Sequence, residues 1–356
     1  MRRWFAQVLD GVVGWFGRAV LRRAPRTPNT LGELAVFRDR SPEELFPAPG
    51  ALPPVRVDAR WRWRGLEGRY LTFPSLHEPL PGPFRRLHAS AYQALDHVPV
   101  RWVVHQDGGP RPTMLFVHGW MQPDSFIEEV TFLPYLARRL GMNIARMTLP
   151  YHGPRRPRAS RIDGDLFWTA DLPRTAEAIR QSVLDVRTLF TWLEAQGNGP
   201  VGLAGMSLGG MVAQAVACFD TRPAFVVPIA AHLDLAGVLE DAMLLEPMRD
   251  ELRGYGWGPA EVDDYLASLG LKDLLPRVPL DRVLFAAGRY DRFLSAHRVE
   301  AQWDRWGRPA IHWFPGGHLG AMLHVRGVVG AMENFFDGLG LGRESRPPAL
   351  LVNPSL

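Results

Sequence analysis

The chain has 356 residues, 46% of them hydrophobic and 22% charged, a balance that is ordinary for a globular protein with a sizeable core. Its formal net charge of +4 depends on arginine, since Lys272 is the sole lysine, and no arginine stripe interleaved with aromatic residues indicates a nucleic-acid surface. The single cysteine, Cys218, excludes a disulfide framework within the chain, and no apolar run reaches the roughly 20 residues that span a bilayer. We therefore expect a cytoplasmic protein, soluble or attached to a membrane surface, that binds no nucleic acid.

Residues 1–23 are predicted to form a basic amphipathic helix. Apolar residues recur there at near-helical spacing, and arginines lie toward both ends of the segment. Gln7 and Asp10 interrupt the apolar run and no small-residue cleavage site follows it, which argues against a secretory signal. Two interpretations stay open: the helix packs on the body of the protein, or it docks on a membrane surface.

Residues 24–54 are dense in proline and are expected to be an extended connecting segment rather than a packed unit. Within it, Ser41 and Pro42 indicate one helical turn with Ser41 as its cap. The main domain is expected over residues 55–340, and residues 341–356 are expected to be a poorly ordered tail.

The main domain begins with alternating apolar and polar residues, which predict antiparallel strands at one edge of a sheet. Buried strands and helices then alternate, as in a mostly parallel sheet with helices on both faces, which is the α/β class. The strands of this alternating part are predicted over residues 113–120, 143–149, 201–206, 224–231, 283–288 and 310–314. The helices are predicted over residues 125–140, 173–196, 208–219, 295–306 and 320–336.

Residues 233–280 interrupt this alternation. They are mostly helical in pattern and contain no convincing strand, which is typical of an insertion over one edge of a sheet. Their apolar residues favour two interpretations that stay open, a cap that lines a hydrophobic pocket and a small helical subdomain that packs on itself.

The sequence Gly205-Met206-Ser207-Leu208-Gly209 joins a predicted strand to a predicted helix. Glycines two residues on either side of a serine let strand and helix pack closely around a strained serine, whose hydroxyl then projects above the sheet. The pattern alone is equally typical of a glycine-rich packing turn.

A nucleophilic serine needs a base and an acid at the carboxyl ends of other strands. Asp291 directly follows the strand at 283–288, and His318 follows the strand at 310–314. Asp291 is alternatively a helix cap, with Asp234 as the substitute acid. His318 is preferred over other histidines on its loop position, because His312 and His324 fall within predicted elements.

These motifs, over about residues 98–336, resemble those of α/β-hydrolase-fold enzymes of the serine esterase and lipase type. The resemblance implies that Ser207 attacks a carbonyl carbon, that His318 acts as general base and then as general acid, and that Asp291 orients His318. It also implies an oxyanion hole made by the backbone N–H groups of Trp120 and Leu208.

The segment Pro150-Tyr151-His152-Gly153 resembles a poorly characterised hydrolase branch, some of whose members suggest lipid acyl esters. His118, Tyr151, His152 and Arg155 are candidate substrate-binding residues. His152 with the neighbouring arginines is expected either to bind an anionic group or to belong to a solvated basic loop. His118 is favoured as a structural hydrogen-bonding residue beside the oxyanion hole.

We expect a serine hydrolase that cleaves a small-molecule or lipid-like carboxylic ester through an acyl-enzyme, with no cofactor. No His-x-x-x-His pair or carboxylate cluster indicates a metal, and no phosphate-binding glycine loop is present in the sequence. A peptidase, an acyltransferase, a non-catalytic binding protein with the same fold and a membrane-surface adaptor remain alternatives. The acyl-chain length, the head group and the oligomeric state stay undetermined.

Overall fold

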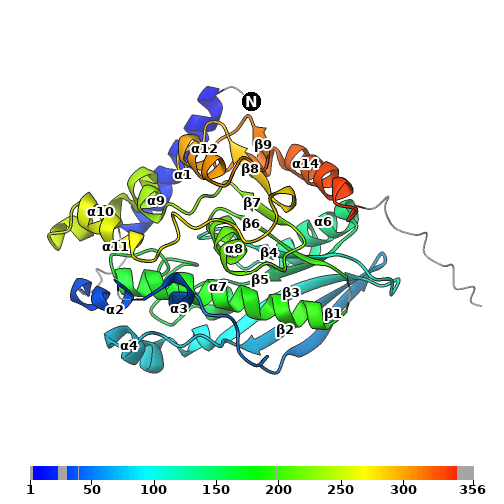
Figure 1. Ribbon diagram of the computed structural model, residues 1–356, viewed down its shortest axis with the longest axis horizontal. Coiled ribbons are helices and arrows are strands. Elements are labelled where there is room, and N and C mark those ends of the chain that lie inside the picture. The colour runs from blue at the N-terminus through cyan, green and yellow to red at the C-terminus, as the bar shows by residue number, and fades with distance from the viewer. Residues whose placement is uncertain (1–2, 23–29, 39, 198, 343–356) are drawn as a thin grey trace, which may run out of the picture.

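The computed structural model describes residues 3–22, 30–38, 40–197 and 199–342, arranged around one sheet (Figure 1). The strands lie in the order β1-β2-β3-β5-β4-β6-β7-β8-β9. Their bounds are β1 Arg56–Trp63, β2 Leu66–Pro74, β3 His97–His105, β4 Thr113–Val117, β5 Asn143–Met147, β6 Val201–Met206, β7 Val226–Ile229, β8 Leu284–Gly288 and β9 Ala310–Phe314. The pairs β1–β2, β2–β3 and β3–β5 are antiparallel, and every pair from β5 to β9 is parallel, as the sequence pattern predicts.

Helices cover both faces of the sheet, so its central strands are buried on both sides. Every residue of β4 and β5 is buried, whereas β1, at the open edge, is mostly exposed. One face is covered by α7 (Leu172–Ala195), α8 (Leu208–Phe219) and α12 (Ala296–Arg305), and the other by α6 (Phe132–Leu140) and α14 (Val325–Gly338).

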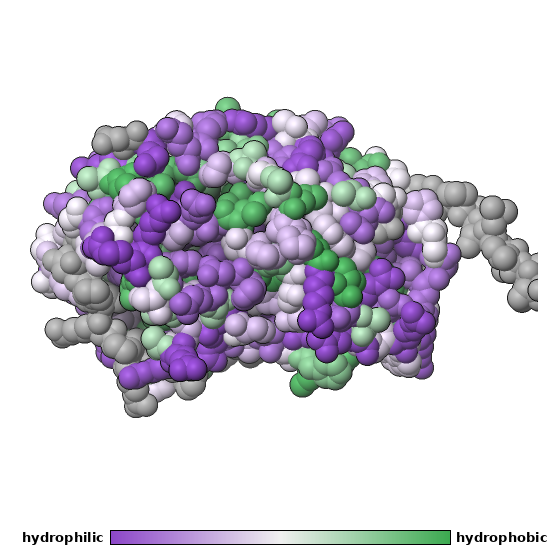
Figure 2. Space-filling view, turned by 90° about the horizontal axis from the view of Figure 1, so that it is seen from below, coloured by the Kyte–Doolittle hydropathy of each residue, from purple (hydrophilic) through white to green (hydrophobic). Residues whose placement is uncertain are grey.

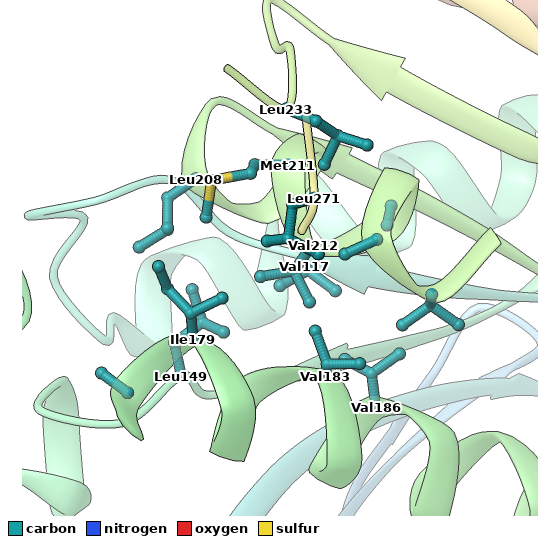
Figure 3. Close-up of a cluster of buried hydrophobic side chains, with 14 of the residues drawn as sticks. Val117, Leu149, Ile179, Val183, Val186, Leu208, Met211, Val212, Leu233 and Leu271 are labelled. Carbon is teal, nitrogen blue, oxygen red and sulfur yellow. The ribbon is translucent and has the colours of Figure 1, made fainter. Parts of the chain in front are cut away.

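The core on the first face is built from side chains at helical spacing. Ile179, Val183 and Val186 lie on one side of α7, because residues four and then three apart share a helix face. In Figure 3 they extend toward Val117, at the end of β4, and Val212 on α8. All five residues are fully buried, so β4, α7 and α8 share one packed core.

Two predicted helices are each divided in the structure. The segment 125–140 forms α5 (Phe126–Val130) and α6, which are separated at Thr131. The segment 320–336 forms α13 (Gly320–Leu323) and α14, separated at His324.

The segment expected to be an extended connection is packed on the domain over its described residues. It contains η1 (Leu31–Leu34), α2 (Ala35–Arg38) and α3 (Pro42–Leu45), and Ser41 and Glu44 form a capping box at the start of α3. Phe46 is buried and stacks on Phe219 at 5.0 Å between ring centroids. The expectation of an extended, unpacked connection was wrong for these residues, because their apolar side chains bury against α7 and α8.

The expected insertion lies between β7 and β8. It contains α9 (Leu235–Asp241), η4 (Met243–Leu245), α10 (Glu246–Gly254) and α11 (Pro259–Ala267), and its described residues include no strand. The amino-terminal helix α1 (Arg3–Leu21) lies beside it (Figure 1). Residues 1, 2, 23 and 343–356, which belong to the predicted amino-terminal segment and tail, lie outside the described residues.

The described helices are all too short or too polar to cross a membrane. On the face shown in Figure 2, hydrophilic residues predominate and hydrophobic residues gather in separate small groups.

Candidate active site

Ser207 occupies a strained turn between β6 and α8. Its backbone angles, a φ of 55° and a ψ of −118°, lie in a region that residues other than glycine rarely adopt. A Cβ on Gly205 would collide with the carbonyl of Gly209, and a Cβ on Gly209 with that of Val117. Both glycines are therefore required by close backbone approach, and the serine stands at a sharp strand-to-helix turn.

The structure brings Ser207, His318 and Asp291 together from the ends of three strands. Ser207 Oγ lies 2.9 Å from His318 Nε2, and His318 Nδ1 lies 2.8 Å from Asp291 Oδ2. Because an ionised carboxylate only accepts hydrogen bonds, the Nδ1–H donates to Asp291 and Nε2 is left to accept the proton of the serine hydroxyl. This geometry is what a nucleophile, base and orienting acid require.

Asp291 is held in place by the backbone that follows it. Its Oδ1 accepts hydrogen bonds from the N–H groups of Phe293 at 2.8 Å and Leu294 at 2.9 Å. One oxygen thus makes the cap-like contacts while the other faces His318. Asp234 is occupied elsewhere, because it caps α9 through Gly237 and pairs with Arg298 at 2.8 Å.

His318 is surrounded by two carboxylates, one of which the sequence reasoning missed. Burial lowers the pKa of His318, but the carboxylates of Asp291 and Asp10 outweigh that effect and raise the pKa above its ordinary value. Asp10, on α1, accepts a hydrogen bond from the His318 backbone N–H at 2.9 Å. The sequence offered one signal for it, an acid that interrupts an apolar run.

A cavity of about 490 Å³ opens beside Ser207 and His318. Its lining is mostly apolar and includes Trp120, Met121, Trp168, Met206, Met211, Val238, Ala242, Leu244, Leu245, Phe293, Leu294 and Met322. Four of these residues come from α9, η4 and the turn between them. The insertion therefore lines the cavity, which resolves the alternative that the sequence left open.

The two predicted oxyanion-hole residues, Trp120 and Leu208, both line this cavity. Leu208 is the first residue of α8, where backbone N–H groups have no acceptor within the helix and the helix dipole favours negative charge. The N–H of the neighbouring Met121 already donates to His152 Nε2 at 3.2 Å. This bond fixes the loop after β4 next to Trp120, whose backbone N–H is predicted to face an oxyanion.

His118 and His152 shape this loop from the interior. His118 Nδ1 lies 2.8 Å from the Gly119 carbonyl, and its Nε2 accepts a hydrogen bond from Leu149 N–H at 3.0 Å. His152 Nδ1 lies 2.8 Å from the Pro150 carbonyl. Burial lowers the pKa of His118 well below its usual range and that of His152 to about 4, so both rings are neutral at pH 7.

The structure corrects the expectation that His118, Tyr151, His152 and Arg155 bind substrate. All four side chains are fully buried, and none lines the cavity. Arg155 pairs with the equally buried Asp185 at 2.8 Å, so its charge neutralises an interior carboxylate instead of meeting an anionic ligand. Tyr151 packs against other aromatic rings.

The described residues contain no group of three or more histidine, cysteine or acidic side chains arranged to hold a metal. Cys218 is buried in α8, and burial raises the pKa of its thiol to about 12. It is therefore a core residue with little thiolate at neutral pH.

Parts of this chain are similar in sequence to known proteins. Residues 134–246 match the model of the family described as alpha/beta hydrolase domain containing 18. An uncharacterized protein of Mycobacterium tuberculosis strain H37Rv is 30% identical over 217 residues, which are 59% of this chain and 50% of the relative. The protein YdjC of Bacillus subtilis is 29% identical over 76 residues, covering 21% of this chain and 66% of that protein. This chain therefore spans about half the length of the mycobacterial relative.

Two solved structures have a similar fold over most of this chain. The acetyl xylan esterase from Paenibacillus sp. R4 has a TM-score of 0.60 at 15% identity, covering 90% of this chain and 98% of that one. Acetyl xylan esterase 1 from Thermoanaerobacterium sp. JW/SL YS485 has a TM-score of 0.54 at 16% identity, covering 88% and 98%. Together with the strand order and the turn at Ser207, these likenesses define the fold class. The chain has the α/β-hydrolase fold, as its sequence motifs predicted.

Proposed function

We propose that the protein is a serine hydrolase that cleaves a carboxylic ester through an acyl-enzyme. The observation that carries this proposal is the hydrogen-bonded series from Ser207 through His318 to Asp291 at the wall of an apolar cavity. The two solved structures named acetyl xylan esterases support ester cleavage on this fold.

The reaction follows from the geometry. His318 Nε2 takes the hydroxyl proton as Ser207 Oγ bonds to the ester carbonyl carbon, and the N–H groups of Trp120 and Leu208 stabilise the resulting oxyanion. The intermediate expels the alcohol, which takes the proton from His318, and leaves an acyl group on Ser207. A water then attacks this acyl group with His318 again as base, which releases the acid and restores the serine.

The cavity supports an apolar acyl group as the recognised part of the substrate. Its lining of methionine, tryptophan and aliphatic side chains offers few polar partners beyond Ser207, His318, Gln122 and His232. A volume of about 490 Å³ exceeds what an acetyl group needs. We therefore propose that the substrate is a lipid-like ester. Peptide-bond cleavage and acyl transfer are the competing reactions.

A fluorophosphonate probe tests the nucleophile. We expect covalent labelling of the wild-type protein and complete loss of label in Ser207→Ala, because only the activated hydroxyl attacks phosphorus. Ser295→Ala, which removes a hydroxyl bonded to Asp241 on the cap, is the matched control and should keep the label. A folded wild-type protein that takes no label would be a non-catalytic member of the fold.

Esters of graded chain length distinguish the reactions. We expect nitrophenyl octanoate to be hydrolysed with a higher kcat/KM than nitrophenyl acetate, since the longer chain fills the cavity. Aminoacyl amides should be poor substrates. Preferential amide cleavage, or acyl transfer to an added alcohol in place of water, would replace the esterase proposal.

We further propose that the outer face of α1 contacts a lipid surface. Trp4, Val8, Val12 and Trp15 follow one side of this helix and are between 42% and 70% exposed. These four residues line a shallow hollow, and Arg292 lies at its border. The positive charge of Arg292 suits anionic head groups. Gly17, farther along α1, lines the cavity, so the same helix connects this surface with the cavity.

Co-sedimentation with vesicles of anionic phospholipid tests this surface. The double variant Trp4→Ser, Trp15→Ser should lose most binding, because tryptophans supply much of the interfacial burial. Trp63→Ser, on β1 at the opposite edge of the sheet, is the matched control and should bind normally. Equal binding by all three proteins would rule out this face.

A further inference from the structure

The amino-terminal helix reaches into the active site through one buried carboxylate. Asp10 is 1% exposed, and its Oδ2 accepts hydrogen bonds from the backbone N–H groups of His318 at 2.9 Å and Arg292 at 3.3 Å. A third N–H, that of Leu319, lies 3.5 Å from Oδ1. These donors belong to the two loops that carry Asp291 and His318, so one side chain ties both loops together.

The surrounding residues leave space for this contact. A Cβ on Gly317 would collide with the Asp10 carboxylate, so the glycine preceding His318 is needed for the approach. Farther along α1, a Cβ on Gly14 would meet Met243 and Phe293 at 3.4 Å. Helix α1 therefore lies close against the cap and against the loop after Asp291.

The charges around His318 come from two carboxylates. Asp291 faces the imidazole Nδ1, and Asp10 is bonded to the backbone of the same residue. The two arginines of the Asp291 loop, Arg289 and Arg292, are both exposed. Burial raises the pKa of Asp10, as does the neighbouring Asp291, while its hydrogen bonds from backbone N–H groups lower it.

We propose that Asp10 is a positioning residue of the active site, which fixes the Asp291 and His318 loops and stabilises the positively charged imidazole that forms during catalysis. This inference rests on the proposed hydrolase function. It assigns α1 a part in the reaction, whereas the catalytic residues expected from the sequence all follow strands of the sheet.

The variant Asp10→Asn tests the charge. Asparagine keeps an oxygen that accepts the His318 N–H bond but removes the negative charge, so His318 should lose a proton more easily. Since the base must be neutral, the acid limb of the pH profile of kcat/KM should move to lower pH. At the plateau we expect kcat/KM to fall about 10-fold, because the positively charged imidazole that forms during the reaction loses a stabilising carboxylate.

Two further variants separate the effect of the Asp10 charge from the effect of attaching α1 to the cap. Glu246→Gln removes the ion pairs of the cap with Arg18 and Arg22 on α1 but leaves Asp10 in place, so its pH profile should match that of the wild type. Gly317→Ala should displace the Asp10 carboxylate without changing any charge, and should shift the acid limb in the same direction as Asp10→Asn. Circular dichroism at each pH establishes that the variants are folded.

A titration of the His318 imidazole by NMR gives a readout that does not depend on activity. A lower midpoint in Asp10→Asn than in the wild type supports the inference even if no ester is hydrolysed, in which case the proposed function fails alone. Equal midpoints, together with an unchanged pH profile, would overturn the role of Asp10 while leaving the hydrolase proposal intact. A shift of the same size in the His318 midpoint of Glu246→Gln would also overturn the role of Asp10. Loosening the attachment of α1 to the cap would then explain the shift without the Asp10 charge.

Discussion

At the scale of single residues, Arg155 is a fully buried charge outside the active site. Its guanidinium pairs with Asp185 and also donates to the carbonyls of Thr148 and Leu95, all in the interior. These bonds join β5 and the turn before β3 to α7. Arg155 thus organises the segment that leads to His152 and, through it, the loop after β4.

We predict that Arg155→Met lowers the free energy of unfolding by about 3–5 kcal/mol at pH 7, because Asp185 is left as an unpaired buried charge. Burial raises the pKa of Asp185, and losing Arg155 raises it further. The folded state then binds a proton more readily than the unfolded chain, so the deficit should shrink as the pH falls. Urea denaturation of the wild type and the variant at two pH values measures this loss of stability. Arg158→Met, at an exposed position, is the control and should change the free energy of unfolding little.

Residue types at strand ends made part of the site predictable. Ser207, Asp291 and His318 were expected together because each follows a buried strand, and the edge of a parallel sheet collects such loops. Arg155 was misjudged because a basic residue in a loop usually lies in solvent, and only tertiary packing supplies Asp185. Asp10 was missed for the same reason, since its partners lie 282 and 308 residues away in the sequence.

At the scale of elements, the inserted helices between β7 and β8 form one wall of the cavity. Val238 on α9 and Leu245 in η4 face the cavity from the cap, while Met211 on α8 faces it from the sheet side. The apolar composition of the insertion was evident in the sequence. Whether those residues face the sheet or each other depends on how the insertion folds back, which local patterns do not encode.

We predict that Val238→Phe narrows the substrate range. The larger ring occupies space in the cavity, so kcat/KM for nitrophenyl octanoate should fall about 10-fold, while that for the acetate changes by less than about twofold. Steady-state kinetics with both esters measure this, and Val57→Phe, exposed on β1, is the control. Parallel losses for both esters would indicate that the acyl chain does not lie against α9.

At the scale of the whole molecule, one sheet divides the protein into two cores that share its central strands. The antiparallel edge and the parallel centre were both predictable, because strands exposed on one face alternate in polarity and strands buried on both faces do not. The breaks at Thr131 and His324 were not predicted, although Pro134, which lacks a backbone N–H, lies in the first turn after the break at Thr131.

The bond between Asp10 and the His318 backbone also has a consequence for biosynthesis. Asp10 precedes His318 by 308 residues, so α1 is synthesised well before the loop that carries His318. The bond between them can therefore form only after the segment from α1 to the loop at His318 has been translated. A nascent chain that already contains the Ser207 turn still lacks the proposed base, so we expect it to react with a fluorophosphonate only after His318 has been made.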